Sequence, residues 1–163
     1  MSLAKIEYIT LDKTEQPEWE VVSALFVRMY KSMDQMGLMI SLVDGGAEKW
    51  LKTVKNTSGK FGIVFLGFSD NEPVGFAQGM IRFLPDYLGG QPVGLIGHVF
   101  VDEKWRREGI GRELVNKLEN WLSMKRVHSI ELQVIGGNPG AGEFWKSLGY
   151  EIELLQYRKP VLK

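Results

Sequence analysis

The sequence predicts one mixed α/β domain whose sheet is antiparallel in its first half and partly parallel in its second half. Three observations predict it. The chain has 163 residues, 44% of them hydrophobic, which is enough for one core. Two neighbouring apolar segments separated by a turn sequence have the form of a hairpin. Beyond them, strand and helix patterns alternate to the end of the chain, which favours parallel pairing.

The first half contains three predicted strands and two predicted helices. The strands are recognised by alternation or by short apolar runs, and the helices by apolar residues that recur at helical spacing. The turn inside the hairpin is Asp70-Asn71-Glu72-Pro73. In chain order we expect a strand at residues 5–10, helices from 19 to about 33 and from 48 to about 56, and strands at 61–68 and 74–84.

The second half begins with an apolar strand and ends with a strand-like tail. Asn138-Pro139 has the form of an N-cap followed by proline at the first helical position, and Gly149 is a helix-ending glycine. We therefore expect a strand at residues 93–101, a helix from near 109 to 122, a strand at 130–134, a short helix from 139 to about 147, and an extended tail at 150–162.

Composition excludes several classes of function. Twenty Lys and Arg balance twenty Asp and Glu, so no strong basic field exists to gather nucleic acid or an anionic membrane. The absence of cysteine removes disulfides, Cys-ligated zinc, iron–sulfur clusters and Cys nucleophiles. His98 and His128 are the two histidines, too few for most His-rich metal sites, so we expect no metal.

The sequence carries no sign of a targeting segment or a second domain. Residues 1–5 lack the apolar core of a signal peptide, and the longest apolar stretches, 61–68 and 93–101, are far shorter than the roughly 20 residues of a membrane span. Repeats, low-complexity tracts and linkers are also missing. We expect a cytoplasmic protein with a single domain at residues 1–163.

The segment between the strand at 93–101 and the following helix carries the chemistry. Gly109 and Gly111 lie on the first helical turn, flanked by Arg106, Arg107 and Arg112. Such a turn presents free N–H groups and a positive dipole end, and glycine lets an anion approach the backbone. The pattern is neither the lysine-bearing P-loop nor the dinucleotide G-x-G-x-x-G. It predicts a phosphate or pyrophosphate cradle; the alternative is a tight helix entry with solvated arginines.

Two signatures resemble a known family. Arg106-x-x-Gly109-x-Gly111 after an apolar strand is similar to the Q/R-x-x-G-x-G/A motif of the GNAT acetyltransferase superfamily, which holds the pyrophosphate of acetyl-coenzyme A. Further on, Asn138-x-x-Ala141-x-x-x-Trp145-x-x-x-Gly149-Tyr150 resembles the family's second signature, N-x-x-A-x-x-x-Y/F-x-x-x-G-F/Y. The resemblance covers residues 93–162, and the earlier residues match in element order only.

The resemblance implies a GNAT-like fold: a mostly antiparallel sheet of about six to seven strands, splayed at the cofactor cleft, with about four helices. Residues 5–90 would form the variable, acceptor-binding half and residues 91–162 the acetyl-CoA-binding half. The strand at 99–101 would offer backbone groups to the pantetheine arm, and residues 107–112 would surround the pyrophosphate. The implied cofactor-binding residues are Val99, Phe100, Val101, Arg106, Arg107, Glu108, Gly109, Ile110, Gly111, Arg112, Asn138 and Trp145.

Some of these roles have alternatives, and three departures from the family pattern matter. Asn138 is a cofactor ligand, an N-cap, or both. Trp145 stands where the family often has a tyrosine that protonates the leaving thiolate; indole cannot do this, so Trp145 either packs the helix or contacts the cofactor. Gln133 stands where some members place a glutamate base. The third departure is the tail, which is too short for the two-strand hairpin that usually closes the sheet.

A protonated amine must lose a proton before it attacks. The candidate catalytic base is His98, with Glu131 or a water chain as alternatives, and a structural role for His98 stays open. Without cysteine, the expected route is direct attack by a bound amine on the thioester, helped by backbone N–H groups near Val101.

The sequence therefore favours an acetyl-CoA-dependent N-acetyltransferase that acts on a small-molecule or peptide amine. A non-catalytic acyl-CoA-binding module and an unrelated phosphate or nucleotide binder are the alternatives. We expect no nucleic-acid or membrane partner, and a second copy of the chain is a candidate partner.

Overall fold

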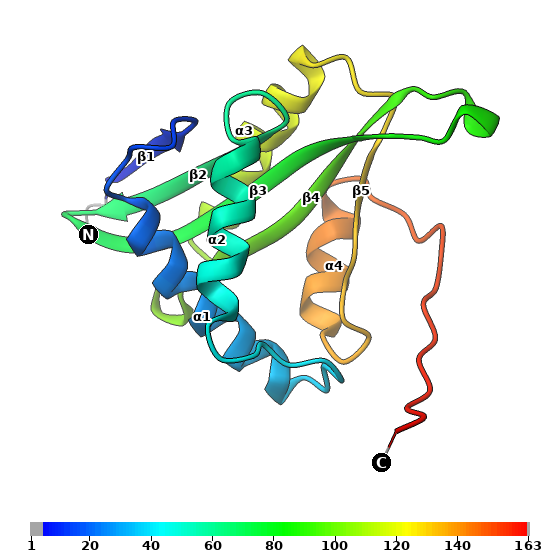
Figure 1. The fold of residues 1–163 in the computed structure, drawn as a ribbon. Helices are drawn as coiled ribbons and strands as arrows, with labels where there is room; N and C mark the ends of the chain where they lie inside the picture. Colours follow the sequence, from blue (N-terminus) through cyan, green and yellow to red (C-terminus); the bar gives the residue numbers. More distant parts are fainter. Residues whose placement is uncertain (1–4, 163) are drawn as a thin grey trace.

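One sheet carries the fold, and it runs in chain order from β1 to β5 (Figure 1). The computed structural model describes residues 5–162, so the expectation about a leader at residues 1–4 lies outside them. The strands are β1 (Ile6–Leu11), β2 (Gly62–Ser69), β3 (Glu72–Phe83), β4 (Pro92–Val101) and β5 (Ile130–Leu132). The helices are α1 (Trp19–Gln35), α2 (Gly46–Thr57), α3 (Ile110–Met124) and α4 (Pro139–Ser147), with single 3₁₀ turns at Asp86–Leu88 and Glu103–Trp105.

The pairing confirms the predicted mixed sheet. β1, β2, β3 and β4 pair antiparallel in sequence, and β5 pairs parallel to β4. The hairpin of β2 and β3 turns at Asp70 and Asn71, both of which have positive φ angles, a conformation that these two residue types tolerate better than most.

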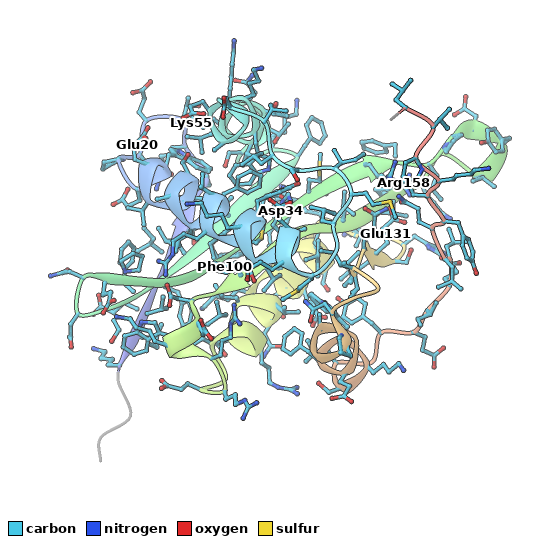
Figure 2. The ribbon with its side chains drawn as sticks, turned by 90° about the horizontal axis from the view of Figure 1, so that it is seen from below. Glu20, Asp34, Lys55, Phe100, Glu131 and Arg158 are labelled. Carbon is cyan, nitrogen blue, oxygen red and sulfur yellow. The ribbon has the colours of Figure 1, made fainter. Side chains whose placement is uncertain are left out.

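Helices cover both faces of the sheet. Figure 2 shows α1 and α2 on one side of the strands and α3 and α4 on the other. On the first side, Trp19, Val22, Leu25 and Phe26 of α1 are buried against strand residues such as Val64 and Phe76, and the rings of Phe26 and Trp50 stack 3.9 Å apart. On the second side, the apolar stripe of α3 is buried against β3 and β4, and α4 packs beside it. Each such buried side chain contributes about 1.5–3 kcal/mol.

The C-terminal tail corrects the sequence-based prediction. Residues 150–162 read as a strand, but the structure shows no strand there, and β5 spans three residues rather than 130–134. Within residues 5–162 the sheet has five strands, fewer than the six to seven that the resemblance implied. The reason is that residues 151–162 are all exposed and form no backbone hydrogen bond with another residue of the described part of the chain.

None of the helices within residues 5–162 is long and apolar enough to cross a membrane.

Candidate functional site

β4 and β5 separate after three paired residues. Their register runs from Gly94 opposite Ile130 to Ile96 opposite Leu132, and no pair follows. On its other edge, β4 stays paired with β3 as far as Val101. The residues of β4 beyond Ile96 therefore leave one backbone edge free among the described residues, as expected for a sheet splayed at a cofactor site.

The direction of the backbone groups on β4 follows from one hydrogen bond. The N–H of Asp102 donates to the carbonyl oxygen of Val74 on β3 at 2.8 Å. Backbone N–H and carbonyl groups point alternately to the two sides of an antiparallel strand, so those of Val99 and Val101 point to the free edge of β4. The backbone groups of Phe100 point to β3, where its carbonyl oxygen lies against Gly75. Of the three predicted strand residues, two thus face the place expected for a pantetheine arm and one does not.

The loop from β4 to α3 has a left-handed backbone at two positions. Arg107 has a φ of 66°, and Gly109, the N-cap of α3, has a φ of 80°. Among residues 5–162 no side chain caps α3, so the N–H groups of its first turn are not satisfied by a side-chain oxygen there. A Cβ at Gly109 would meet nothing within 4 Å, so the space in front of the helix is open. An uncapped helix start with open space fits an anion such as a pyrophosphate.

The arginines around this turn have different surroundings. Arg106 donates from Nε to the carbonyl oxygen of Val101 at 3.0 Å, which fastens the loop to the end of β4. Arg112 donates from Nη2 to Oγ of Ser147 on α4 at 3.3 Å. Arg107 and Glu108 are exposed. Ile110 is buried in the core, so its backbone is the part available to a ligand. The loop therefore brings these predicted residues together at one end of α3.

Asn138 and Trp145 both have structural partners. Oδ1 of Asn138 accepts from the N–H of Ala141 at 3.1 Å, so the predicted N-cap is confirmed. Trp145 packs edge-on against Phe144 and Tyr150, with ring centroids 5.0 and 5.2 Å away. These contacts favour the packing interpretation of Trp145, and they leave the side-chain N–H₂ of Asn138 as the group available to a cofactor arm.

Tyr150 closes the end of α4 onto α3. Its hydroxyl donates to Oε1 of Glu119 at 2.8 Å, and burial, followed by the bond to Glu119, raises its pKa above the ordinary value. A phenol held in this way is a poor proton donor, so Tyr150 does not take the role of the tyrosine that the family often has at the position of Trp145. Gln133 is exposed, and its side chain meets Gln156 at 3.4 Å.

His98 lies on the opposite side of β4 from α3. Gly97 forms a bulge, because Gln78 of β3 pairs with His98 whereas Gly79 pairs with Ile96. The imidazole lies among aromatic rings from α1 and α2, with centroids 5.1 Å from Phe26 and 5.6 Å from Trp50. Burial in these surroundings lowers the pKa of His98 to about 4. The side chain is therefore neutral at pH 7 and able to accept a proton, although as a weaker base than a free imidazole.

Sequence reasoning did not find several residues that shape this region. Gln78 is buried beside His98, and Asp102 is buried at the end of β4, where it forms an ion pair with Arg28 of α1 and accepts from the N–H of Lys104. The bulge had one local signal, since glycine inside a strand often marks one, and Gly97 lies within the apolar run of β4. Nothing in the local sequence indicates the Arg28–Asp102 pair, which joins residues far apart in the chain.

Within residues 5–162, no group of three or more His, Asp or Glu side chains is placed to hold a metal ion.

Comparisons with known proteins agree with this geometry. The sequence model described as "Acetyltransferase (GNAT) family" matches residues 20–150. An uncharacterized N-acetyltransferase of Methanocaldococcus jannaschii is 34% identical over 82 residues, which cover 50% of this chain and 36% of that protein. Aminoglycoside N(6')-acetyltransferase type 1 of Stenotrophomonas maltophilia is 38% identical over 64 residues, which cover 37% of this chain and 40% of that protein. The chain thus spans well under half the length of these two relatives.

Solved structures share the fold. The aminoglycoside N-acetyltransferase AAC(6')-Iy in complex with CoA has a TM-score of 0.75 at 18% identity, with 98% of both chains covered. An aminoglycoside acetyltransferase from an uncultured soil metagenomic sample, in complex with sisomicin, has a TM-score of 0.70 at 20% identity, with 96% of this chain and 97% of the other covered. The family match extends over most of the chain and includes the splayed strands and the glycine-bearing helix start, so this protein belongs to the acetyltransferase (GNAT) family.

Proposed function

We propose that this protein is an acetyl-CoA-dependent N-acetyltransferase that transfers the acetyl group directly to a primary amine of a small molecule. The observation that carries the proposal is the pairing of two features: the free edge of β4 beyond Ile96, and the uncapped start of α3 at Gly109. The first suits an extended amide-bearing arm and the second suits its pyrophosphate, so together they match the two ends of one ligand.

Residues 91–162 would form the acetyl-CoA half. The N–H groups of Gly109 through Arg112, with the side chains of Arg106 and Arg107, would hold the pyrophosphate. The backbone of Val99 and Val101 would bond the pantetheine arm, and Asn138 would add its side-chain amide. Trp145 would act mainly through its packing against Tyr150, which holds α4 beside α3. Residues 5–90 would supply the acceptor site.

An acyl-cysteine intermediate is impossible because the chain has no cysteine, which favours direct transfer from the thioester to the amine. The amine nitrogen forms a bond to the carbonyl carbon, the carbon–sulfur bond breaks, and CoA leaves as a thiolate. Backbone N–H groups on the free edge of β4, such as that of Val101, would stabilise the negative charge that develops on the carbonyl oxygen. The thiolate of a thiol with a pKa of roughly 8.5 is a good leaving group, so the transfer does not require a proton donor at the position of Trp145.

His98 is the proposed base that removes the proton of the amine. It lies on the α1 and α2 side of β4, which is the half proposed for the acceptor, and its imidazole is neutral. Three of the four proteins described above are, by their names, aminoglycoside acetyltransferases, which supports small polyamino compounds as first candidates for the acceptor.

The decisive experiment measures the release of free CoA thiol from acetyl-CoA in the presence of amines that include aminoglycosides, polyamines and peptides. We expect release above the hydrolysis rate with at least one small amine, and acetylated product by mass spectrometry. The Gly111→Val variant is the negative control. Binding of CoA by calorimetry without thiol release for any amine would favour the alternative, a non-catalytic acyl-CoA-binding module. Exclusive activity on peptides would contradict the proposed acceptor class.

A further inference from the structure

An ion pair joins β3 to β5 across β4. Oε1 of Glu131 accepts a hydrogen bond from Nε of Arg82 at 2.6 Å, and Nη2 of Arg82 lies 2.6 Å from the same oxygen. The two side chains are 42% and 43% exposed, so solvent and small molecules reach both of them. Arg82 therefore uses one oxygen of an accessible carboxylate, and Oε2 is the oxygen that a second donor can use.

The ion pair lies on the face of the sheet opposite to α3. A Cβ at Gly79 or Gly94 would meet a leucine side chain of α3, so these two positions face that helix. Residues alternate between the two faces along a strand, which places Arg82 and Leu95 on the other face. Glu131 is the cross-strand partner of Leu95 and shares its face. The pair is thus on the side of the sheet that α1 and α2 cover.

The same face carries His98, the proposed base. Its cross-strand partner Gln78 is two residues away from Met80, the partner of Leu95. Two residues of a strand span about 7 Å and neighbouring strands are about 5 Å apart, so the Cα atoms of His98 and Glu131 lie about 8 Å apart. Among the described residues, the apolar cluster beneath α1 and α2 includes none from β5, and Figure 2 shows Glu131 beside these helices rather than beneath them.

We propose that Glu131 is a specificity-determining residue, whose carboxylate binds a second ammonium group of an acceptor that presents its first nitrogen to His98. Arg82 is the cation that this ammonium displaces. The inference rests on the proposed acetyl transfer, which places the acceptor on this face. An acceptor with one amine leaves the ion pair intact and gains nothing from it, so the site favours compounds with two amines at this spacing. A carboxylate that always holds one cation or the other is a recognition group rather than the base.

The two members of the pair should have opposite effects on the affinity for a diamine. Loss of the carboxylate removes the group that binds the second ammonium, whereas loss of the guanidinium removes its competitor. If the pair served only to stabilise the sheet, substitution of either member would weaken binding or leave it unchanged. The sign of the effect at Arg82 therefore separates recognition from a structural role.

Binding is measured by calorimetry on the full chain in the presence of CoA, which has no acetyl group to transfer. The probes are 1,6-diaminohexane and hexylamine, which differ by one amine. We expect Glu131→Gln to weaken the diamine about fivefold, the upper range for a half-exposed ion pair, and Arg82→Met to strengthen it by about two- to fivefold. Hexylamine should change by less than about twofold in either variant, because it leaves Glu131 untouched.

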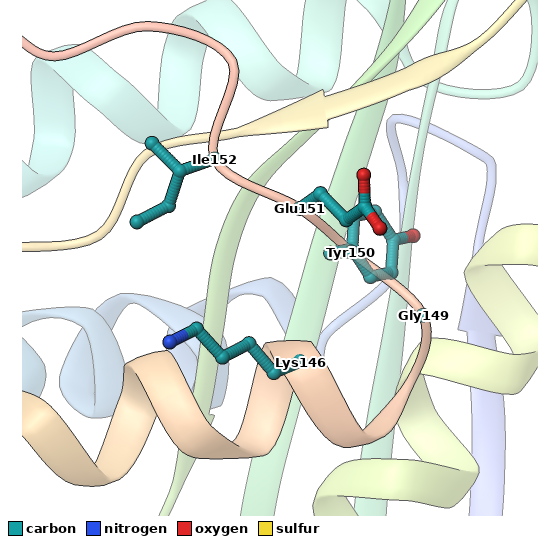
Figure 3. A pocket seen from close by; sticks show the side chains of 5 residues that line it. All are labelled: Lys146, Gly149, Tyr150, Glu151 and Ile152. Carbon is teal, nitrogen blue, oxygen red and sulfur yellow. The ribbon is translucent and has the colours of Figure 1, made fainter.

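Glu151→Gln is the matched control, because it makes the same change of charge at another exposed glutamate. Glu151 lies next to α4, at a surface hollow of about 440 Å³ (Figure 3). The hollow is lined by Lys146, Gly149, Tyr150, Glu151 and Ile152. This variant should keep the wild-type affinity for the diamine. A loss equal to that of Glu131→Gln would show that only the overall charge matters, and it would contradict the proposal.

Steady-state kinetics give the second readout. With the diamine as acceptor, Glu131→Gln should raise KM about fivefold and change kcat little, since the second ammonium lies away from the reacting atoms. No binding of the diamine, binding that Glu131→Gln does not weaken, or a loss of affinity in both Glu131→Gln and Arg82→Met would overturn the proposal. Opposite effects of the two variants on binding, without acetylated product for any amine, would support recognition by Glu131 and contradict the proposed acetyl transfer alone.

Discussion

Nδ1 of His98 lies 3.2 Å from Oε1 of Gln78, its cross-strand partner on β3. An amide oxygen only accepts, so in this arrangement Nδ1 carries the proton and donates it. Nε2 is then the ring nitrogen left to accept a proton. Gln78 is buried and therefore holds both the tautomer and the orientation of the imidazole. This pair gives the proposed base a defined direction.

The pH dependence of turnover should show the low pKa of His98. An ordinary imidazole would give an acid limb near 6.5, but burial lowers the pKa of this one to about 4. With His98 as the base, we expect turnover to fall on the acid side near pH 4, and this fall should stay at the same pH for acceptors of different amine pKa. A second fall in turnover should move with the pKa of the amine itself. His98→Gln should lower turnover by roughly 10²–10⁴-fold. Near-normal turnover in His98→Gln would return His98 to a structural role.

Folding stability should also depend on His98. In the unfolded chain the imidazole titrates near 6.5, whereas in the folded protein its pKa is about 4. Between these values the unfolded state binds more protons, so stability falls as the pH drops from about 6.5 toward 4. His98→Gln should reduce this slope by up to about 1.4 kcal/mol per pH unit, as measured by urea unfolding at several pH values. An unchanged slope in His98→Gln would contradict this prediction.

Gly111 should be essential for CoA binding but not for folding. A Cβ there would come no closer than 3.5 Å to Phe144, which is ordinary contact, so the fold can accept a side chain. The branched side chain of Gly111→Val would instead occupy space at the helix start that the pyrophosphate needs. We expect at least a tenfold loss of CoA affinity by calorimetry, equivalent to about 1.4 kcal/mol. Gly142→Val is the matched control in α4, and wild-type affinity in Gly111→Val would refute the cradle.

Trp145→Phe should change turnover less than about tenfold, because loss of a true general acid costs roughly 10²–10⁴-fold. The smaller ring keeps part of the contact with Phe144 and Tyr150, so melting temperature and CoA affinity are measured alongside turnover. A thousandfold loss of turnover with folding and CoA affinity intact would mean that the indole takes part in the chemistry.

Asp102 should stabilise the junction between β4 and the cofactor loop. Asp102→Ala removes the ion pair with Arg28 and the acceptor for the N–H of Lys104, and we expect a loss of about 1–3 kcal/mol in the free energy of unfolding. Glu72→Ala is the control, because its ion pair with Lys104 is about half exposed on both sides, and it should cost less than about 1 kcal/mol. Equal losses in the two variants would show that the burial of Asp102 is unimportant.

The sequence alone determined the parts of this protein that depend on neighbouring residues. The hairpin of β2 and β3 follows from two apolar runs and a turn, and the ends of α4 follow from Asn138 and Gly149. The glycine-bearing start of α3 was predictable because a helix start is a local feature, and the two signatures identified the family. The turn and the helix ends need only the contacts of a residue with others a few positions away.

Tertiary structure decided what depends on pairing between distant segments. Alternation along β4 would place Ile96 and His98 on the same face, but the bulge at Gly97 turns His98 toward α1 and α2. Burial by rings from these helices then sets its pKa, which no local pattern reveals. The tail at residues 150–162 also shows that local sequence does not decide pairing. Its sequence is suited to a strand, but a strand forms only where another strand edge in the correct register supplies hydrogen bonds.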